Sequence, residues 1–174
     1  MKRIITFLAI VVITVAAAQN SAGQNTLKFG HINNDELVRS MPEFDSAMVT
    51  LENLRQQVVN DIELLQVEFN NAYNRYLTES SKWSDMVRQT KEEELGSMSQ
   101  KIEAFQAQAQ QQMQETQGKL LQPILEKADK AIKSVGRENG FIYIFDTSQG
   151  VLLFFDETKS TDIMSLVKEK LGVK

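Results

Sequence analysis

Residues 44–86 read FDSAMVTLENLRQQVVNDIELLQVEFNNAYNRYLTESSKWSDM. Apolar residues recur along this segment in two series, each with a spacing of seven residues. The members of the two series alternate at spacings of four and three. The first series is Phe44, Leu51, Val58, Leu65, Ala72, Glu79 and Met86, and the second is Met48, Arg55, Ile62, Phe69, Tyr76 and Trp83. Only Arg55 and Glu79 are charged, and such a repeat is typical of the seam of a left-handed coiled coil. The segment therefore predicts a long helix that packs against a second helix.

The chain is expected to reverse direction at residues 78–84, TESSKWS. Several of these side chains compete for backbone hydrogen bonds, and Ser84 before Asp85 suits the N-cap of a new helix. After this turn, apolar residues again recur at spacings of three and four: Leu95, Met98, Ile102, Phe105 and Ala109. We therefore expect a helical hairpin over residues 43–120, which we call the arm, and not one continuous rod.

Three residues in the arm or at its base are candidate hinges: Gly96, Gly118 and Pro123. A glycine inside a helix costs about 1 kcal/mol relative to alanine, so it marks a place where the helix can bend. Gly118 and Pro123 also bracket the expected joint between the arm and the rest of the chain.

The rest of the mature chain, residues 19–42 and 121–174, is expected to form a β-rich body. Two short apolar runs, FIYIF at 141–145 and VLLFF at 151–155, flank the turn-rich sequence DTSQG. This pattern predicts a β-hairpin. A further strand is expected at about residues 26–32.

Polar residues beside these strands predict where two helices begin. Asn33 or Asn34 suits the N-cap of a short helix after the first strand. Ser160 or Thr161 suits the N-cap of a final helix over residues 162–171.

The predicted hairpin strands are apolar on both faces, so neither face of the sheet can be left in water. Each exposed large side chain would forgo roughly 1.5–3 kcal/mol of burial, which favours self-association through the sheet. The candidate oligomerisation residues are Phe141, Ile142, Tyr143, Ile144, Phe145, Val151, Leu152, Leu153, Phe154 and Phe155. The alternative is a monomer whose long hairpin folds back over the sheet. The expected fold class is α+β, with a small β-sheet body that oligomerises and a long coiled-coil hairpin arm.

Residues 1–18 have the layout of a secretory signal peptide. A basic start, MKR, precedes an uncharged apolar run at residues 4–15, and small alanines follow it. The apolar run is too short for a comfortable membrane span, so we expect cleavage after Ala18, with Ala22 as the alternative site. An uncleaved membrane anchor is the competing interpretation. Cleavage would place a soluble mature chain outside the cytoplasm.

The composition argues against an enzyme. The chain of 174 residues has no cysteine and a single histidine, so it offers no thiol nucleophile, thiolate zinc site or histidine cluster. His31 is close in sequence to Asp35 and Glu36, but a lone histidine beside capping carboxylates is more often structural than catalytic. The sequence contains no glycine-rich phosphate loop. No cofactor and no metal are therefore expected.

The acidic residues are concentrated in the arm. The chain has a net charge of −4, and residues 43–120 hold seven Lys and Arg against thirteen Asp and Glu. The rest of the chain after residue 18 has ten of each kind. Because an acidic surface repels phosphate backbones, nucleic acid is not an expected partner.

Several motifs, and their order along the chain, resemble the Skp/OmpH family of periplasmic chaperones. The chain has a secretory signal, a strand close to the mature start and a long glutamine-rich helical hairpin. Four short motifs follow: LLQPIL at 120–125, AIKSV at 131–135, ENGFIYIFD at 138–146 and STDIMSLV at 160–167. The resemblance covers nearly the whole mature chain.

This resemblance implies a trimeric, ATP-independent holdase of the periplasm. A β-barrel body would carry three helical arms around a cavity, in which unfolded outer-membrane β-barrel proteins are held. The best-known relatives are strongly basic, whereas this arm is net acidic. The sequence does not address direct contact with a membrane.

A holdase needs a surface that binds many unfolded sequences weakly, which suits flexible thioethers and broad aromatic faces. The heptad series assigns some of these candidates to the seam, but Tyr73 and Leu77 lie off it. The rival hypothesis is a coiled-coil scaffold or spacer of the cell envelope, which would keep its apolar residues on the seam. The candidate client-binding residues are Phe69, Tyr73, Tyr76, Leu77, Trp83, Met86, Met98, Phe105 and Met113.

Overall fold

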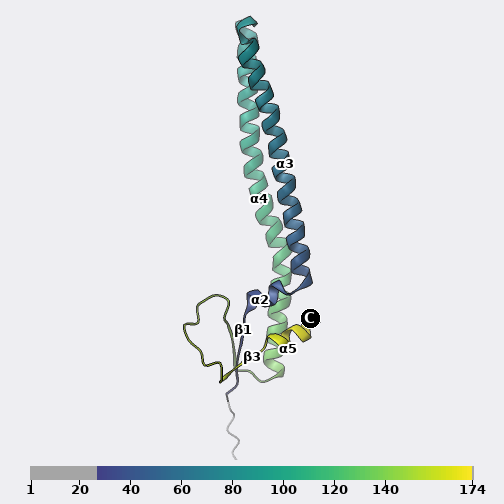
Figure 1. Ribbon diagram of the computed structural model, residues 1–174, viewed down its shortest axis with the longest axis vertical. Helices are drawn as coiled ribbons and strands as arrows, with labels where there is room; N and C mark the ends of the chain where they lie inside the picture. Colours follow the sequence, from purple (N-terminus) through teal and green to yellow (C-terminus); the bar gives the residue numbers. More distant parts are fainter. Residues whose placement is uncertain (1–26, 174) are drawn as a thin grey trace, which may run out of the picture.

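The computed structural model describes residues 27–173, and the predicted signal peptide, residues 1–18, lies outside them. A long helical hairpin extends from a small body that contains the sheet, α2 and α5 (Figure 1). The alternative in which the hairpin folds back over the sheet is therefore wrong. The elements are, in order, β1 (Phe29–Ile32), α2 (Asn34–Arg39), α3 (Pro42–Glu79), η2 (Ser80–Lys82), α4 (Asp85–Glu138), β2 (Tyr143–Asp146), β3 (Ser160–Asp162) and α5 (Met164–Leu171).

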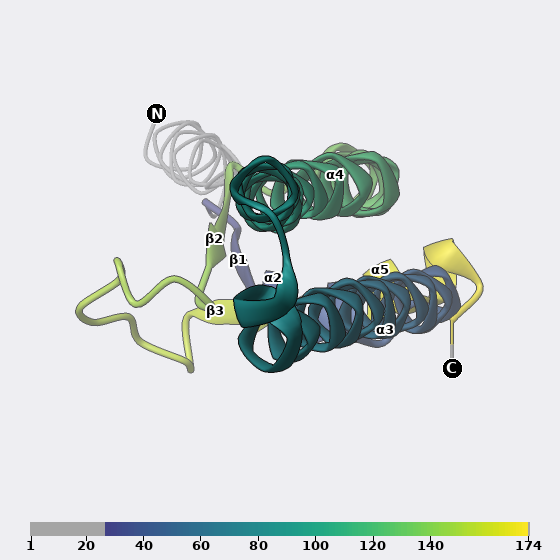
Figure 2. The same cartoon turned by 90° about the horizontal axis from the view of Figure 1, so that it is seen from above.

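The turn of the arm is where the sequence predicts it. Helix α3 ends at Glu79, and a single 3₁₀ turn, η2, carries the chain toward α4. The Ser84 side chain accepts a hydrogen bond from the Val87 amide and caps α4, as expected from its place before Asp85. The two helices then lie side by side along the arm (Figures 1 and 2).

The seam follows the two heptad series with one local correction. Most of their members on α3 are half-buried against α4. Arg55, however, is exposed and donates two hydrogen bonds to Glu52, at 2.9 and 2.7 Å, while Leu54 takes the half-buried position. The charged side chain is thus accommodated outside the seam, because an apolar neighbour one residue earlier is available to face α4.

Helix α4 is continuous from the tip of the arm into the body, over 54 residues. It passes without a break through Gly96, Gly118 and Pro123. A β-carbon built on either glycine would have no neighbouring atom within 4 Å, so packing does not require glycine at these positions. The boundary between arm and body is therefore not marked by an interruption of the helix, and the role of these residues as hinges stays a prediction.

The sheet has three strands in the order β2-β1-β3, and β1 is parallel to both neighbours. The register places Phe29 opposite Tyr143 and Ser160, and His31 opposite Phe145 and Asp162. The expected strand at residues 26–32 is confirmed as the central strand.

One face of the sheet packs against the helices and forms the core of the body. Gly30 faces this side, and a β-carbon built on it would lie 3.2–3.3 Å from side-chain atoms of Ile163, Ile144 and Phe141. Only glycine allows this close approach without a shift of its neighbours. The buried core residues are Ile32, Leu37, Val38, Met41, Ala47, Ile124, Ala128, Ala131, Val135, Ile163 and Val167.

The predicted β-hairpin is wrong. Strand β2 pairs with β1 and not with residues 151–155, which form no strand. The chain leaves the sheet at Asp146, whose carboxylate accepts hydrogen bonds from the amides of Asn34 and Ser148. This turn directs the following loop away from β2, and the chain returns on the other side of β1 as β3.

The predicted N-caps have different outcomes. The Asn33 side chain accepts a hydrogen bond from the Glu36 amide and caps α2, which confirms one of the two alternatives. Neither Ser160 nor Thr161 caps α5, because both belong to β3. Asp162 instead accepts a hydrogen bond from the Met164 amide at 2.8 Å.

Candidate binding surfaces

Aromatic side chains gather at the distal end of the arm. The Phe69 and Tyr73 rings are stacked with centroids 6.1 Å apart, and the Tyr76 and Trp83 rings meet edge to face at 6.0 Å. Phe69 and Tyr76 are half-buried in the seam, whereas Tyr73 is exposed. The first pair therefore extends from the seam toward solvent, whereas both rings of the second pair are half-buried.

Polar contacts hold this end of the arm together. The Tyr76 hydroxyl donates a hydrogen bond to the Glu92 carboxylate, which joins α3 to α4. This hydrogen bond raises the pKa of Tyr76 above its ordinary value, because ionisation would lose the donated proton. Tyr76 is therefore neutral and positioned throughout the physiological range.

The candidate client-binding residues divide into two groups. Tyr73 and Leu77 are exposed, as their places off the heptad series predict, and the Leu77 side chain is 58% exposed. Met86 belongs to the first turn of α4 and is 80% exposed, although it continues a heptad series. The half-buried candidates, which contribute to the seam, are Phe69, Tyr76, Trp83, Met98, Phe105 and Met113.

Further exposed aliphatic residues lie along α3 and at the start of α4, and the sequence analysis did not select them. All of them fall outside the two heptad series. The heptad pattern that identified the seam could therefore also have identified them as an outer apolar surface. They are Val49, Val59, Leu64, Val67 and Val87.

The face of the sheet opposite the helices is aromatic. Phe29 stacks on Tyr143 with centroids 6.3 Å apart, and Tyr143 lies 6.1 Å from Phe145. The His31 ring lies 4.7 Å from the Phe155 ring, and its Nδ1 atom lies 2.9 Å from Ser160 Oγ. His31 is thus a structural link between β1, β3 and the loop that precedes β3.

A shallow cavity of about 260 Å³ opens on this aromatic face. Beside it, the loop between β2 and β3 projects away from the helices (Figure 2). This loop exposes Val151, Leu153 and Phe154, and the last two are 98% and 84% exposed. The cavity is lined by Phe29, Phe145, Phe155, Asp156, Lys159 and Ser160.

The candidate oligomerisation residues are not gathered on one face, because residues 151–155 lie in the loop between β2 and β3. Ile142, Tyr143, Val151, Leu153 and Phe154 are exposed. Phe141 and Ile144 pack against the helical core of the body. The remaining candidates, Phe145, Leu152 and Phe155, are half-exposed.

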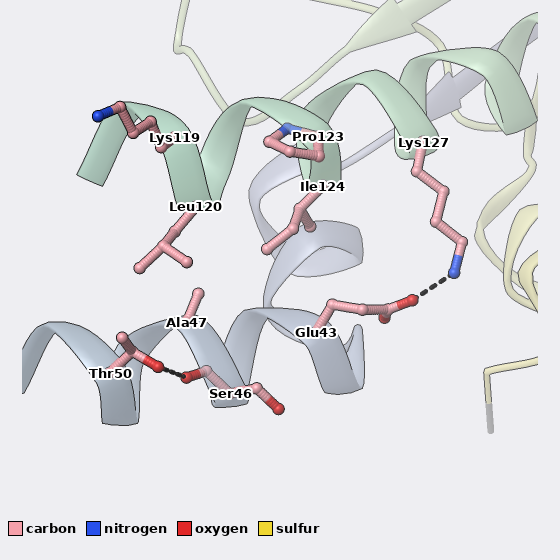
Figure 3. Close-up of a pocket in the computed structure, with 9 residues that line it drawn as sticks. All are labelled: Glu43, Ser46, Ala47, Thr50, Lys119, Leu120, Pro123, Ile124 and Lys127. Atoms are coloured by element: carbon pink, nitrogen blue, oxygen red, sulfur yellow. Dashed lines mark hydrogen bonds and ion pairs between the residues drawn. The ribbon is translucent and has the colours of Figure 1, made fainter. Parts of the chain in front are cut away.

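A second cavity, of about 410 Å³, lies between α3 and α4 at the base of the arm (Figure 3). Ala47, Leu120 and Ile124 form its apolar floor. At one end, the Lys127 ammonium contacts the Glu43 carboxylate, and this hydrogen bond lowers the pKa of Glu43. The contact fastens the two helices where the arm meets the body.

Neither a metal site nor a membrane-spanning helix is found in the part of the chain that the structure describes. Over residues 27–173, no three His, Asp or Glu side chains gather in an arrangement that could hold a metal ion. Within the same range, the long helices are too polar to cross a membrane.

Comparisons with known proteins find the same architecture elsewhere. A family model described as "Outer membrane protein (OmpH-like)" matches residues 28–171. Among solved structures, a protein from Caulobacter crescentus described as a "putative outer membrane chaperone (OmpH-like)" superposes with a TM-score of 0.71. The two chains are 13% identical, and the match covers 86% of each. No curated protein matches the chain.

Proposed function

This chain belongs to the OmpH-like family, and we propose that it acts as an ATP-independent holdase chaperone of the periplasm. In this proposal it binds unfolded outer-membrane β-barrel proteins and keeps them from aggregating. The family match and the fold shared with an OmpH-like chaperone support a chaperone of this type.

The exposed apolar surface of the arm is the observation that carries the proposal. The seam already buries one side of each helix, yet Tyr73, Leu77 and Met86 are exposed near the tip. A spacer protein would have no need of these side chains, whereas an unfolded chain can cover them in many different arrangements. Thioether and aromatic groups suit such contacts, because they are polarisable and tolerate varied geometry.

The body is proposed to assemble into a homo-oligomer, and the family resemblance implies a trimer. The aromatic face of the sheet and the loop residues Val151, Leu153 and Phe154 would meet their counterparts in neighbouring subunits. Burial of each such side chain contributes roughly 1.5–3 kcal/mol, so a few of them suffice for association. Arms that project from a common body would then enclose a cavity for the unfolded client.

Aggregation of a client tests the chaperone proposal. A urea-unfolded outer-membrane β-barrel protein is diluted into buffer without ATP, and light scattering is recorded with and without the mature protein. We expect the scattering to be suppressed and the suppression to saturate near one oligomer per client. Unchanged scattering at several-fold excess of folded protein would contradict the proposal and favour the envelope scaffold.

Native mass spectrometry tests the assembly separately. We expect the mature protein to be trimeric. The double variant Leu153→Ser, Phe154→Ser should dissociate into monomers at a higher protein concentration than the wild type does. Both side chains are exposed in the single chain, so these changes leave the fold of the subunit intact. A wild-type monomer at micromolar concentration would contradict the proposed assembly.

A further inference from the structure

The middle of α3 carries an exposed surface on which apolar and acidic side chains alternate. Val59, Glu63 and Val67 follow one another at spacings of four residues, which places their side chains together on one side of the helix. Leu64 and Glu68 form a second row at the same spacing. We call this surface the mid-arm patch, and its exposed members are Val59, Asp61, Glu63, Leu64, Val67 and Glu68.

The carboxylates of the patch have no basic partner within residues 27–173. No lysine or arginine lies between Arg55 and Arg75 on α3. These two arginines pair with other carboxylates of their own helix, since Arg55 contacts Glu52 at 2.7 Å and Arg75 contacts Glu79 at 3.3 Å. The negative charge of the patch is therefore not compensated within its own helix.

The neighbouring part of α4 adds little positive charge. Two contacts between the helices, Tyr76 with Glu92 and Glu43 with Lys127, bracket the patch, so the middle of α3 lies beside the middle of α4. Residues 104–114 of α4 contain no charged side chain and are rich in glutamine and alanine. Lys101 is the nearest base in the sequence of α4, and it forms no ion pair among the described residues.

We propose that the mid-arm patch binds stretches of unfolded protein in which lysine or arginine is interleaved with apolar residues. This inference rests on the holdase function proposed above and assigns that function a preference among client segments. The alternation of the patch itself carries the argument: Leu64 is 59% exposed and offers an apolar contact, and acidic neighbours flank it on the same surface. A cationic amphipathic segment complements both properties at once.

The strength of these contacts suits reversible binding. An exposed ion pair contributes little binding free energy, because water screens both charges, so three carboxylates bias the choice between segments without trapping them. The same carboxylates repel acidic segments, which adds to the discrimination. The preference is expected to weaken as salt is added, because exposed charges are screened over about 8 Å at physiological ionic strength.

Two labelled peptides that differ only in charge test the inference on the full mature protein. Both carry the same leucine and valine residues, and one interleaves them with lysine while the other interleaves them with glutamate. Fluorescence anisotropy measures each affinity at low and at high salt. We expect the lysine peptide to bind at least about threefold more tightly at low salt, and this preference to shrink in 1 M salt.

Matched variants locate the preference on the arm. The triple variant Asp61→Asn, Glu63→Gln, Glu68→Gln removes the carboxylates of the patch and keeps the shape of each side chain. The control variant Glu126→Gln, Glu157→Gln, Glu169→Gln removes three exposed carboxylates from the rest of the chain. We expect the first to abolish most of the preference and the second to preserve it.

The outcomes separate this inference from the proposed holdase function. If both peptides bind equally and clients are still protected from aggregation, the holdase function stands and the preference is wrong. If the control variant loses the preference as fully as the patch variant, overall charge and not the patch is responsible, which also overturns the inference. A patch variant that changes the oligomeric state and leaves the peptide preference intact would identify the surface as a contact between copies, which also overturns the inference. If neither peptide binds and no client is protected, both proposals fail.

Discussion

The Tyr76 hydroxyl donates a hydrogen bond to the Glu92 carboxylate and so joins the two helices just below the turn of the arm. The ring of Tyr76 also meets Trp83 edge to face. Trp83 is the only tryptophan in the chain, so its fluorescence reports on this end of the arm alone.

Tyr76→Phe removes the hydroxyl and keeps the ring against Trp83. We expect the tip to open more often, because the direct polar link between α3 and α4 is lost. Amide hydrogen exchange near the turn should accelerate, while exchange in the body and the Trp83 emission spectrum stay nearly unchanged. Amide exchange that accelerates equally in the body would show that the hydrogen bond does not stabilise the tip of the arm alone.

Leu54 and Arg55 provide a test of the seam. Leu54 is half-buried against α4 and Arg55 is exposed. Leu54→Ala is expected to cost about 1–2 kcal/mol of unfolding free energy, since only part of the side chain is buried. Arg55→Ala should leave the midpoint of urea unfolding nearly unchanged. A larger loss from Arg55→Ala would show that the simple heptad register is the correct one.

The arm could be predicted from the sequence because its information is local and repetitive. A spacing of three and four residues over ten turns fixes which side of α3 meets α4, and a single departure such as Arg55 shifts only one position. The exposure of Tyr73 and Leu77 followed from the same pattern, since both lie off the seam.

The body was less predictable because its strands pair over long distances in the sequence. Ser160–Asp162 is short and polar, so it resembles a helix cap and gives no signal of a strand. Its place beside β1 is set by register and by the contact between His31 and Ser160. The apolar run at 151–155 has the composition of a strand, but it pairs with none of the three strands, although β2 lies at an edge of the sheet.

Gly96→Ala and Gly118→Ala test whether the arm uses its glycines to bend. An added β-carbon meets no atom within 4 Å at either position, so no clash opposes the better helix former. Each change is expected to stabilise α4 by about 1 kcal/mol and to raise the melting temperature. If the glycines are hinges, the distribution of distances between labelled arm tips should also narrow. A lower melting temperature would contradict the predicted gain.

Acid should weaken the base of the arm through Glu43. The pKa of Glu43 is lowered in the folded chain, chiefly by the hydrogen bond from Lys127. The ionised carboxylate thus stabilises the fold at pH values above the unfolded pKa of about 4.5, and this stabilisation is lost as the pH falls through the lower folded value.

The variant Lys127→Met isolates this contribution, because it keeps the length of the side chain without its charge. Both partners are about half exposed, so the expected loss at pH 7 is less than about 1 kcal/mol. The difference between variant and wild type in urea unfolding should shrink as the pH is lowered from 7, and it should vanish once Glu43 is protonated in the folded chain as well. Lys119→Met, whose pair with Glu115 spans 4.0 Å in exposed surroundings, serves as the control. A loss that stays the same as the pH is lowered would contradict this account.

Photo-crosslinking from the arm tests the central claim most directly. A photoreactive amino acid replaces exposed Leu77, or exposed Lys130 on the part of α4 that lies in the body, and a labelled unfolded outer-membrane protein is added without ATP. We predict strong crosslinks from position 77, little signal from position 130, and none with the same client once it is folded. Crosslinks that are absent at position 77, or equally strong at both positions, would contradict the claim that the arm holds unfolded chains.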